Sequence, residues 1–432
     1  MLRRGTATAH AAHGTNGWRC SFALPTGRRR RFSAAAAAKK EVYAWGMGLE
    51  QPGVMDATPR CFDLPSPHLA STSSSSACKR ASELCGGSNK SVQLSQGDFM
   101  VVVYENEDGT EQEVVSWGNN DRGQLGLGDR QKRFWGEASS WRWPVKERGR
   151  LRTIALGRNH ALFASDDRVY SCGRGMRGQT GLSTTEDTLQ PTEVEALRGK
   201  RIKGMAAGDD FSIVATEEGV FGFGNRKKLD VSSSTSPEDV FRPKLMEKVS
   251  AIMEDAGDLQ HIACGWGHSL MLVGSKVYAW GSNLHGQCGI GTKEESVILP
   301  RLVEALADQP VAMVSCGGSY SLALTRDSRE VYVWGSVKDD KSGLGDVKED
   351  ILRPRRIPLF DKEKRVCEVS CGTDHAAVRT EDGNVYTWGF GQHGTLGFPE
   401  ARNEKEPRLL QLPNNKRCIG ISCGMDITLA FV

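Results

Sequence analysis

Tyr278-Ala279-Trp280-Gly281 is one of seven copies of a short stretch that ends in an aromatic residue and glycine. The other copies are Tyr43-Ala44-Trp45-Gly46, Val115-Ser116-Trp117-Gly118, Tyr170-Ser171-Cys172-Gly173, Phe221-Gly222-Phe223-Gly224, Tyr332-Val333-Trp334-Gly335 and Tyr386-Thr387-Trp388-Gly389. Their glycines are 72 residues apart at the first gap and 51 to 57 residues apart afterwards. A repeat of this length is typical of structural units that are stacked around one core.

A second element recurs out of phase with the first, as an apolar stretch that leads into glycine. Its copies are Gly97-Asp98-Phe99-Met100, Gly157-Arg158-Asn159-His160, Gly208-Asp209-Asp210-Phe211, Gly265-Trp266-Gly267-His268, Gly317-Gly318-Ser319-Tyr320, Gly372-Thr373-Asp374-His375 and Gly424-Met425-Asp426-Ile427. In five of the six internal units the glycines of the two elements lie 16 to 18 residues apart. This spacing fits two or three short strands joined by hairpins rather than a helix.

The order of the two elements predicts how the array closes. The chain begins with an unpaired aromatic-glycine element at residues 41–46 and ends with an unpaired glycine element at residues 421–432. Joined, these halves make a seventh unit, and a ring that shares one unit between both termini has no open sheet edge. We therefore predict an all-β fold, a seven-bladed β-propeller over residues 41–432, with the last residues paired near Tyr43.

The first 40 residues differ in composition from the rest of the chain. They hold nine Lys or Arg and no Asp or Glu, so the formal charge of +3 for the whole chain becomes −6 for the remainder. An arginine- and alanine-rich, acid-free leader is typical of a mitochondrial transit peptide. We expect residues 1–40 to be such a peptide, disordered before cleavage. A disordered basic tail or a nuclear signal at Arg28-Arg29-Arg30-Arg31 are the alternatives.

Insertions into the repeat are the first places to look for function. Residues 51–91 include the serine-rich run 71–76 and are predicted to form a mobile loop. Residues 104–113 extend a hairpin with an acidic tip around Asp108, either as a solvated turn or as a wedge that contacts a partner.

The segment 130–152 combines basic and aromatic residues. Aromatic rings and arginines together suit RNA or a protein hot spot. The alternative is that the tryptophans pack on their own blade while the basic residues extend outward. The candidate partner-binding residues are Arg133, Phe134, Trp135, Trp141, Arg142, Trp143, Arg148 and Arg150.

Several motifs that suggest chemistry are positions of the repeat. The two Gly-x-Gly-x-x-Gly matches, at residues 173–178 and 389–394, open no helical pattern, and a dinucleotide site needs a helix N-terminus. His160, His268 and His375 share one repeat position with Met100, Phe211, Tyr320 and Ile427, so we assign them a structural role. We predict no cofactor, no metal and no enzyme activity. No stretch approaches 18 consecutive apolar residues, which argues against a membrane span.

The combined unit resembles the regulator of chromosome condensation repeat. Its best match is the loop Asn119-Asn120-Asp121-Arg122-Gly123-Gln124-Leu125-Gly126-Leu127-Gly128-Asp129, and the resemblance covers residues 41–432. The blade that holds Asn225-Arg226-Lys227-Lys228 lacks the Gly-Gln-x-Gly loop, and the one that holds residues 338–346 keeps only part of it.

Within that family the chain looks most like the mitochondrial branch, on Trp45-Gly46-Met47-Gly48-Leu49, Gly178-Gln179-Thr180-Gly181-Leu182 and Val220-Phe221-Gly222-Phe223-Gly224-Asn225. This resemblance implies a protein of the mitochondrial matrix that supports ribosome assembly through ribosomal RNA and assembly proteins. It also allows a peripheral association with the inner membrane. We expect a monomer within a larger assembly.

The family resemblance also implies a second function, guanine-nucleotide exchange on a GTPase. The partner would be a mitochondrial small or dynamin-like GTPase, rather than the Ran GTPase of the nuclear branch. Such a factor needs protruding acids, and the candidates in this sequence are Asp98, Asp108, Asp209, Asp374 and Asp426.

Overall fold

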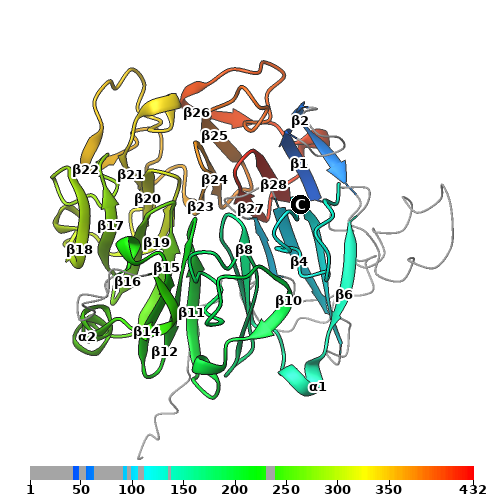
Figure 1. Ribbon diagram of the computed structural model, residues 1–432. Helices are drawn as coiled ribbons and strands as arrows, with labels where there is room; N and C mark the ends of the chain where they lie inside the picture. The colour runs from blue at the N-terminus through cyan, green and yellow to red at the C-terminus, as the bar shows by residue number, and fades with distance from the viewer. Residues whose placement is uncertain are drawn as a thin grey trace, which may run out of the picture.

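The computed structural model describes residues 42–47, 55–62, 91–94, 99–105, 111–134, 138–229 and 239–432. Within them, seven antiparallel sheets of four strands each form a ring (Figure 1). The innermost strand of each sheet contacts the innermost strand of the next sheet, and the series returns to its start. The prediction of an all-β, seven-bladed propeller is confirmed.

Blade 4 shows the four-strand order that the propeller repeats. Its strands run from the ring axis outward as β15 Leu259–Cys264, β16 His268–Val273, β17 Lys276–Asn283 and β18 Glu294–Leu302. All six residues of β16 are buried, because both faces of this sheet pack against neighbouring blades. The apolar stretch after each glycine element is therefore a core strand.

The other blades repeat this order. Blade 1 holds β3 Ser91–Leu94, β4 Phe99–Glu105, β5 Gln112–Gly118 and β6 Ser139–Trp143. Blade 2 holds β7 Thr153–Leu156, β8 His160–Ala164, β9 Val169–Gly173 and β10 Thr188–Glu193. Blade 3 holds β11 Ile202–Ala207, β12 Phe211–Thr216, β13 Gly219–Gly224 and β14 Val240–Leu245.

Blade 5 holds β19 Val311–Cys316, β20 Tyr320–Thr325, β21 Val331–Gly335 and β22 Ile351–Arg356. Blade 6 holds β23 Val366–Cys371, β24 His375–Thr380, β25 Val385–Gly389 and β26 Glu404–Leu410. Helical turns connect or cap some strands: α1 Val145–Arg148, α2 Glu247–Ala256, η5 Glu195–Leu197, η6 Arg226–Lys228, η7 Glu304–Leu306, η8 Lys338–Asp340 and η9 Pro413–Asn415.

Both ends of the chain build the closing blade, as predicted. Strands β27 Gly420–Cys423 and β28 Ile427–Phe431 form its inner half, and β1 Val42–Met47 and β2 Met55–Phe62 form its outer half. Tyr43 pairs with Ala430, and Gly46 pairs with Ile427. Figure 1 shows β1, in blue, beside β28, in dark red.

The structure describes part of the predicted loop 51–91 and part of the predicted hairpin 104–113. Strand β2 lies inside the range 51–91 that the sequence predicts as a loop, because β2 is the outermost strand of the closing blade. Residues 1–41 and 63–90 lie outside the described residues. The extended hairpin of blade 1 is present, since Tyr104 pairs with Glu113 and Glu105 with Gln112. Its acidic tip with Asp108 lies outside the described part.

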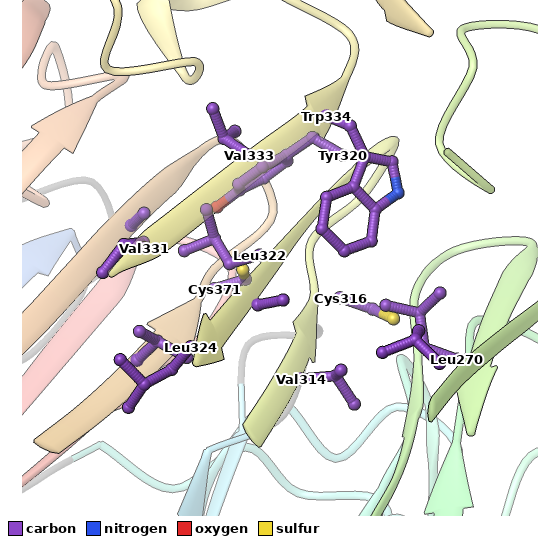
Figure 2. Close-up of a cluster of buried hydrophobic side chains, with 14 of the residues drawn as sticks. Leu270, Val314, Cys316, Tyr320, Leu322, Leu324, Val331, Val333, Trp334 and Cys371 are labelled. Carbon is purple, nitrogen blue, oxygen red and sulfur yellow. The ribbon is translucent and has the colours of Figure 1, made fainter. Parts of the chain in front are cut away.

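Large side chains fill the spaces between blades. Figure 2 shows one such cluster, in which Trp334 and Tyr320 of blade 5 lie among apolar residues of several strands. Leu270 of blade 4 and Cys371 of blade 6 belong to the same cluster. Because each cluster spans adjacent blades, the blades stabilise one another rather than fold as separate units.

The outermost strand of each blade was not among the predicted elements. In six blades, the closing blade included, it bulges opposite the third strand: three residues, the last of them proline, stand opposite a single residue. These prolines are Pro59, Pro191, Pro243, Pro300, Pro354 and Pro407. Proline is tolerated at sheet edges and bulges because it has no N–H to donate.

Candidate interaction surface

Two kinds of connection lie at the same end of the propeller. Strand direction reverses at each step across an antiparallel sheet, so turns after the first strand and loops after the third strand share one end. We call this end the loop face. In blade 4 it carries the turn at residues 265–267 and the loop at residues 284–293.

The Gly-Gln-x-Gly loop of blade 1 is held by its own asparagine. The Asn120 Oδ1 atom accepts a hydrogen bond from the N–H of Leu125 at 3.0 Å, and Asn120 Nδ2 donates to the carbonyl of Asp129 at 3.0 Å. Gly123 has a φ of +79°, and a Cβ there would lie 2.5 Å from Leu189 of blade 2. The glycine therefore lets the loop lie directly against the next blade. The two Gly-x-Gly-x-x-Gly matches enter equivalent loops.

A chain of hydrogen bonds joins these loops to the histidines. His268 Nε2 lies 2.9 Å from Ser321 Oγ of the next blade, and that hydroxyl donates to the carbonyl of Gln287 at 2.9 Å. The same arrangement links His160, Ser212 and Gln179, and links His375, Thr428 and Thr395. The three histidines therefore join neighbouring blades, which agrees with their assignment as repeat positions.

Burial depresses the basicity of these histidines. It lowers the pKa of His268 to about 3, and the pKa values of His160 and His375 to about 4. A buried imidazole loses the hydration that stabilises its charged form. Because the serine hydroxyl already donates to Gln287, the neutral ring of His268 donates through Nε2–H.

The candidate exchange acids that the structure describes lie on the loop face and are paired with basic groups. Asp209 lies 3.6 Å from Arg158 and 3.7 Å from Lys228. Asp374 pairs with Lys341 of the preceding blade, and Asp426 accepts from His393 Nδ1 at 2.9 Å. Asp98 and Asp108 lie outside the described residues.

Sequence reasoning missed a related set of contacts between blades. A basic residue just before the Gly-Gln pair reaches an aspartate just before the outermost strand of the next blade. The pairs are Arg122 with Asp187 at 3.4 Å, Arg177 with Asp239 at 3.1 Å, and His285 with Asp350 at 3.0 Å. The recurrence of Arg or His at one repeat position and Asp at another is the signal that would have revealed them.

The aromatic part of segment 130–152 packs inward. Trp143 is 2% exposed, and its ring lies 5.2 Å from that of Tyr170 and 6.1 Å from that of Phe163 in blade 2. Trp141 is half-buried and lies 5.6 Å from Phe163. The Arg148 guanidinium covers the rings of Tyr170 and Trp143 at 4.7 and 5.4 Å. These residues form one inter-blade cluster.

The remaining candidates of this segment are spread along its length. The Arg142 side chain is 73% exposed and lies 3.5 Å from Glu111. Arg133 is tied to Asp129 at 2.7 Å, and Phe134 and Arg150 are half-buried. Trp135 lies outside the described residues. Arg142 is therefore the most accessible of the described candidates.

Within the described residues, no group of three or more His, Cys, Asp or Glu side chains could hold a metal ion. Burial raises the pKa values of the Cys264, Cys371 and Cys423 thiols to about 12, so they remain protonated and act as small apolar groups. No described helix has the length and apolarity that crossing a bilayer requires.

Comparison with known proteins identifies the family. The RCC1-like domain matches residues 69–430. The ultraviolet-B receptor UVR8 of Arabidopsis thaliana is 33% identical over 306 residues, which cover 69% of this chain and 66% of the receptor. The probable E3 ubiquitin-protein ligase HERC4 of Homo sapiens is 31% identical over 322 residues, 74% of this chain but 29% of the ligase. The chain belongs to the RCC1-like domain family.

Two solved structures share the fold over nearly the whole chain. Human WBSCR16 is 18% identical, with a TM-score of 0.71, and the match covers 92% of this chain and 99% of that one. Prp20p of Saccharomyces cerevisiae is 20% identical, with a TM-score of 0.71 and 92% coverage of both chains. At this identity the likeness establishes the architecture.

Proposed function

We propose that this chain is a non-enzymatic mitochondrial scaffold that supports ribosome assembly through contacts with ribosomal RNA and assembly proteins. The observation that carries the proposal is the outer edge of blade 1, at β6 and α1. There the exposed side chains of Arg142 and Lys146 lie beside the buried ring of Trp143. The second support of the proposal is the acid-free basic leader ahead of a mildly acidic body. A leader of this composition directs import into mitochondria.

The edge of blade 1 suits phosphate groups better than stacked bases. Trp143 is buried and Trp141 is half-buried against Phe163, so their rings are occupied within the protein. Arg142 and Lys146 are exposed. A surface ion pair such as that between Arg142 and Glu111 contributes only about 0–1 kcal/mol, so an RNA phosphate can replace the carboxylate.

A guanine-nucleotide exchange factor is the second candidate. The structurally similar Prp20p binds Gsp1p and histones. Asp209, Asp374 and Asp426 of this chain lie on one face, as an exchange surface requires. Each is paired with a basic side chain, however, so a GTPase would have to displace Arg158, Lys341 or His393.

Affinity purification of the tagged full chain from fractionated cells distinguishes the two functions. Mitochondrial ribosomal RNA and assembly factors in the eluate would support the scaffold, whereas a nucleotide-free GTPase would support exchange. Recovery in the nuclear fraction would contradict the proposed location. The matched variant is Arg142→Glu with Lys146→Glu, which should reduce RNA recovery while leaving the fold intact because both side chains are exposed.

A further inference from the structure

In four blades, the loop of the preceding blade covers the bulge of the outermost strand. A backbone N–H of that loop donates to the carbonyl of the first bulged residue. The donors and acceptors are Gly128 to Leu189 at 2.9 Å, Ser183 to Phe241 at 3.0 Å, Gly291 to Leu352 at 2.8 Å, and Gly345 to Lys405 at 3.0 Å. The three apolar acceptors, Leu189, Phe241 and Leu352, are half-buried as a result.

Blade 4 lacks this cover. Its bulge is Ile298-Leu299-Pro300, opposite Trp280. Ile298 is 63% exposed and Leu299 is 46% exposed. In the part of the chain that the structure describes, no backbone N–H of blade 3 donates to the Ile298 carbonyl. The outer edge of blade 4 therefore presents an apolar patch where four other blades carry a docked loop.

The indole of Trp280 also differs from the equivalent indoles of three other blades. Trp334 Nε1 donates to the carbonyl of Gln287 at 2.8 Å, and Trp388 Nε1 donates to the carbonyl of Lys341 at 3.1 Å. Trp45 Nε1 donates likewise to Thr395 at 2.8 Å. Trp280 is fully buried, yet its Nε1 atom has no hydrogen-bond partner among the residues that the structure describes.

The cause lies in the sequence of blade 3. After β13 the chain has no Gly-Gln-x-Gly loop and forms the short helix η6 instead. Helix η6 contacts β18, and Ser296 Oγ donates to the carbonyl of Lys227 at 3.4 Å. Lys227 is exposed at the border of the patch. Residues 230–238, which follow, lie outside the described residues.

We propose that Ile298 and Leu299 form a docking site for a glycine-containing turn of a partner protein. Such a turn would take the place that the loop of the preceding blade fills in those four blades, with its backbone N–H donating to the Ile298 carbonyl. The exposed apolar side chains and this backbone acceptor favour a polypeptide over a nucleic acid, whose phosphates carry no donor. Lys227 at the border favours an acidic residue in the turn.

This inference rests on the proposed role as an interaction scaffold, but not on which assembly the scaffold serves. It predicts a contact at blade 4, far along the ring from the basic edge of blade 1. The full purified chain is sufficient to test it, without RNA or organelles. A failure here would therefore leave the affinity-purification result unaffected, and the reverse also holds.

The test is a methyl NMR titration of the full chain with a cyclic peptide of the sequence Asn119–Asp129, which has the glycines and the acid that the site requires. We expect the methyl signals of Ile298 and Leu299 to shift and to saturate below about 1 mM, the weak end of specific recognition. Leu409, 41% exposed on β26, is the control methyl and should not move. Alanine at Gly123 and Gly126 of the peptide should abolish binding, because both need a positive φ.

Ile298→Asp should also abolish the shifts without changing thermal stability, since the side chain is largely exposed. No shift up to about 1 mM, or equal shifts at Leu409, would overturn the proposal. Binding that appears only after residues 230–238 are replaced by a Gly-Ser linker would show that the chain fills the site itself. Shifts caused by an RNA oligonucleotide but not by the peptide would assign the site to RNA.

Discussion

His268 of blade 4 donates a hydrogen bond across the blade boundary to the Ser321 hydroxyl of blade 5, with 2.9 Å between Nε2 and Oγ. The hydroxyl passes a second hydrogen bond to the carbonyl of Gln287, so a core strand, the next core strand and a loop are joined in one chain. All three side chains are buried. Removing one member leaves a buried polar group without its partner.

Ser321→Ala should destabilise the propeller by about 1–3 kcal/mol, because the Nε2–H of His268 then has no acceptor in the core. Chemical denaturation followed by circular dichroism measures the free energy of unfolding. The control is the double variant Ser321→Ala with His268→Phe, which places phenylalanine where blade 3 has Phe211. It should recover part of the loss. Equal stability of Ser321→Ala and the native chain would contradict a role for this hydrogen bond.

Stability should fall as the pH is lowered from 6.5 toward 4. The folded pKa values of His160, His268 and His375 lie well below the unfolded value of 6.5, so the unfolded chain binds more protons in this window. Three such groups give a slope of up to about 4 kcal/mol per pH unit. Melting temperatures at pH 7, 6 and 5 test this above the range where carboxylates titrate. His268→Phe should reduce the slope by about a third; an unchanged slope would refute the linkage.

The indoles of Trp334 and Trp280 should respond differently to the same substitution. Trp334→Phe removes a buried hydrogen bond to Gln287, whereas Trp280→Phe removes a buried N–H that has no partner within the described ranges. Both changes leave a similar cavity, so Trp334→Phe should cost about 1 kcal/mol more than Trp280→Phe. Parallel denaturation of both variants gives this difference directly. A larger loss for Trp280→Phe would show that its indole is satisfied in solution.

The repeat was sufficient to predict the ring because its two elements are core strands with fixed spacing. The aromatic-glycine element ends at a glycine that lies close to the turn between the first two strands of its own blade: a Cβ on Gly46 would lie 2.0 Å from the carbonyl oxygen of Asp426. Because only glycine fits this close approach, every copy of the element ends in glycine. The outermost strand leaves a weaker mark, since its edge position tolerates varied residues around one proline.

The candidate sites were harder to predict, for a physical reason. Sequence reveals that Trp143 and Arg142 are adjacent, but not that alternate residues of β6 face opposite sides, which buries Trp143 and exposes Arg142. The patch at Ile298 was harder still. Its exposure follows from a loop missing in the preceding blade, about 70 residues earlier in the chain, and only the ring brings the two together.

Replacement of Arg142 and replacement of Trp143 should have opposite effects. Trp143→Ala should cost about 3–5 kcal/mol of stability, because it empties a buried aromatic site between blades 1 and 2. Arg142→Ala should change stability by less than about 0.5 kcal/mol and reduce RNA recovery. Thermal melts and RNA quantification on the same preparations separate the two. Reduced RNA recovery with Trp143→Ala alone, at native stability, would instead place base stacking at that ring.

Closure through the termini predicts the effect of a truncation. Removing residues 420–432 deletes β27 and β28, which leaves β1 without its partner and opens the ring at two blade boundaries. Because the clusters that hold the blades together span those boundaries, we expect the cooperative melting transition to be lost. Removal of Val432 alone, which lies beyond β28, is the matched control and should leave the transition unchanged. If the truncated chain melted cooperatively at the native temperature, the closing blade would not be what completes the propeller. Calorimetry of the three chains decides between the two outcomes.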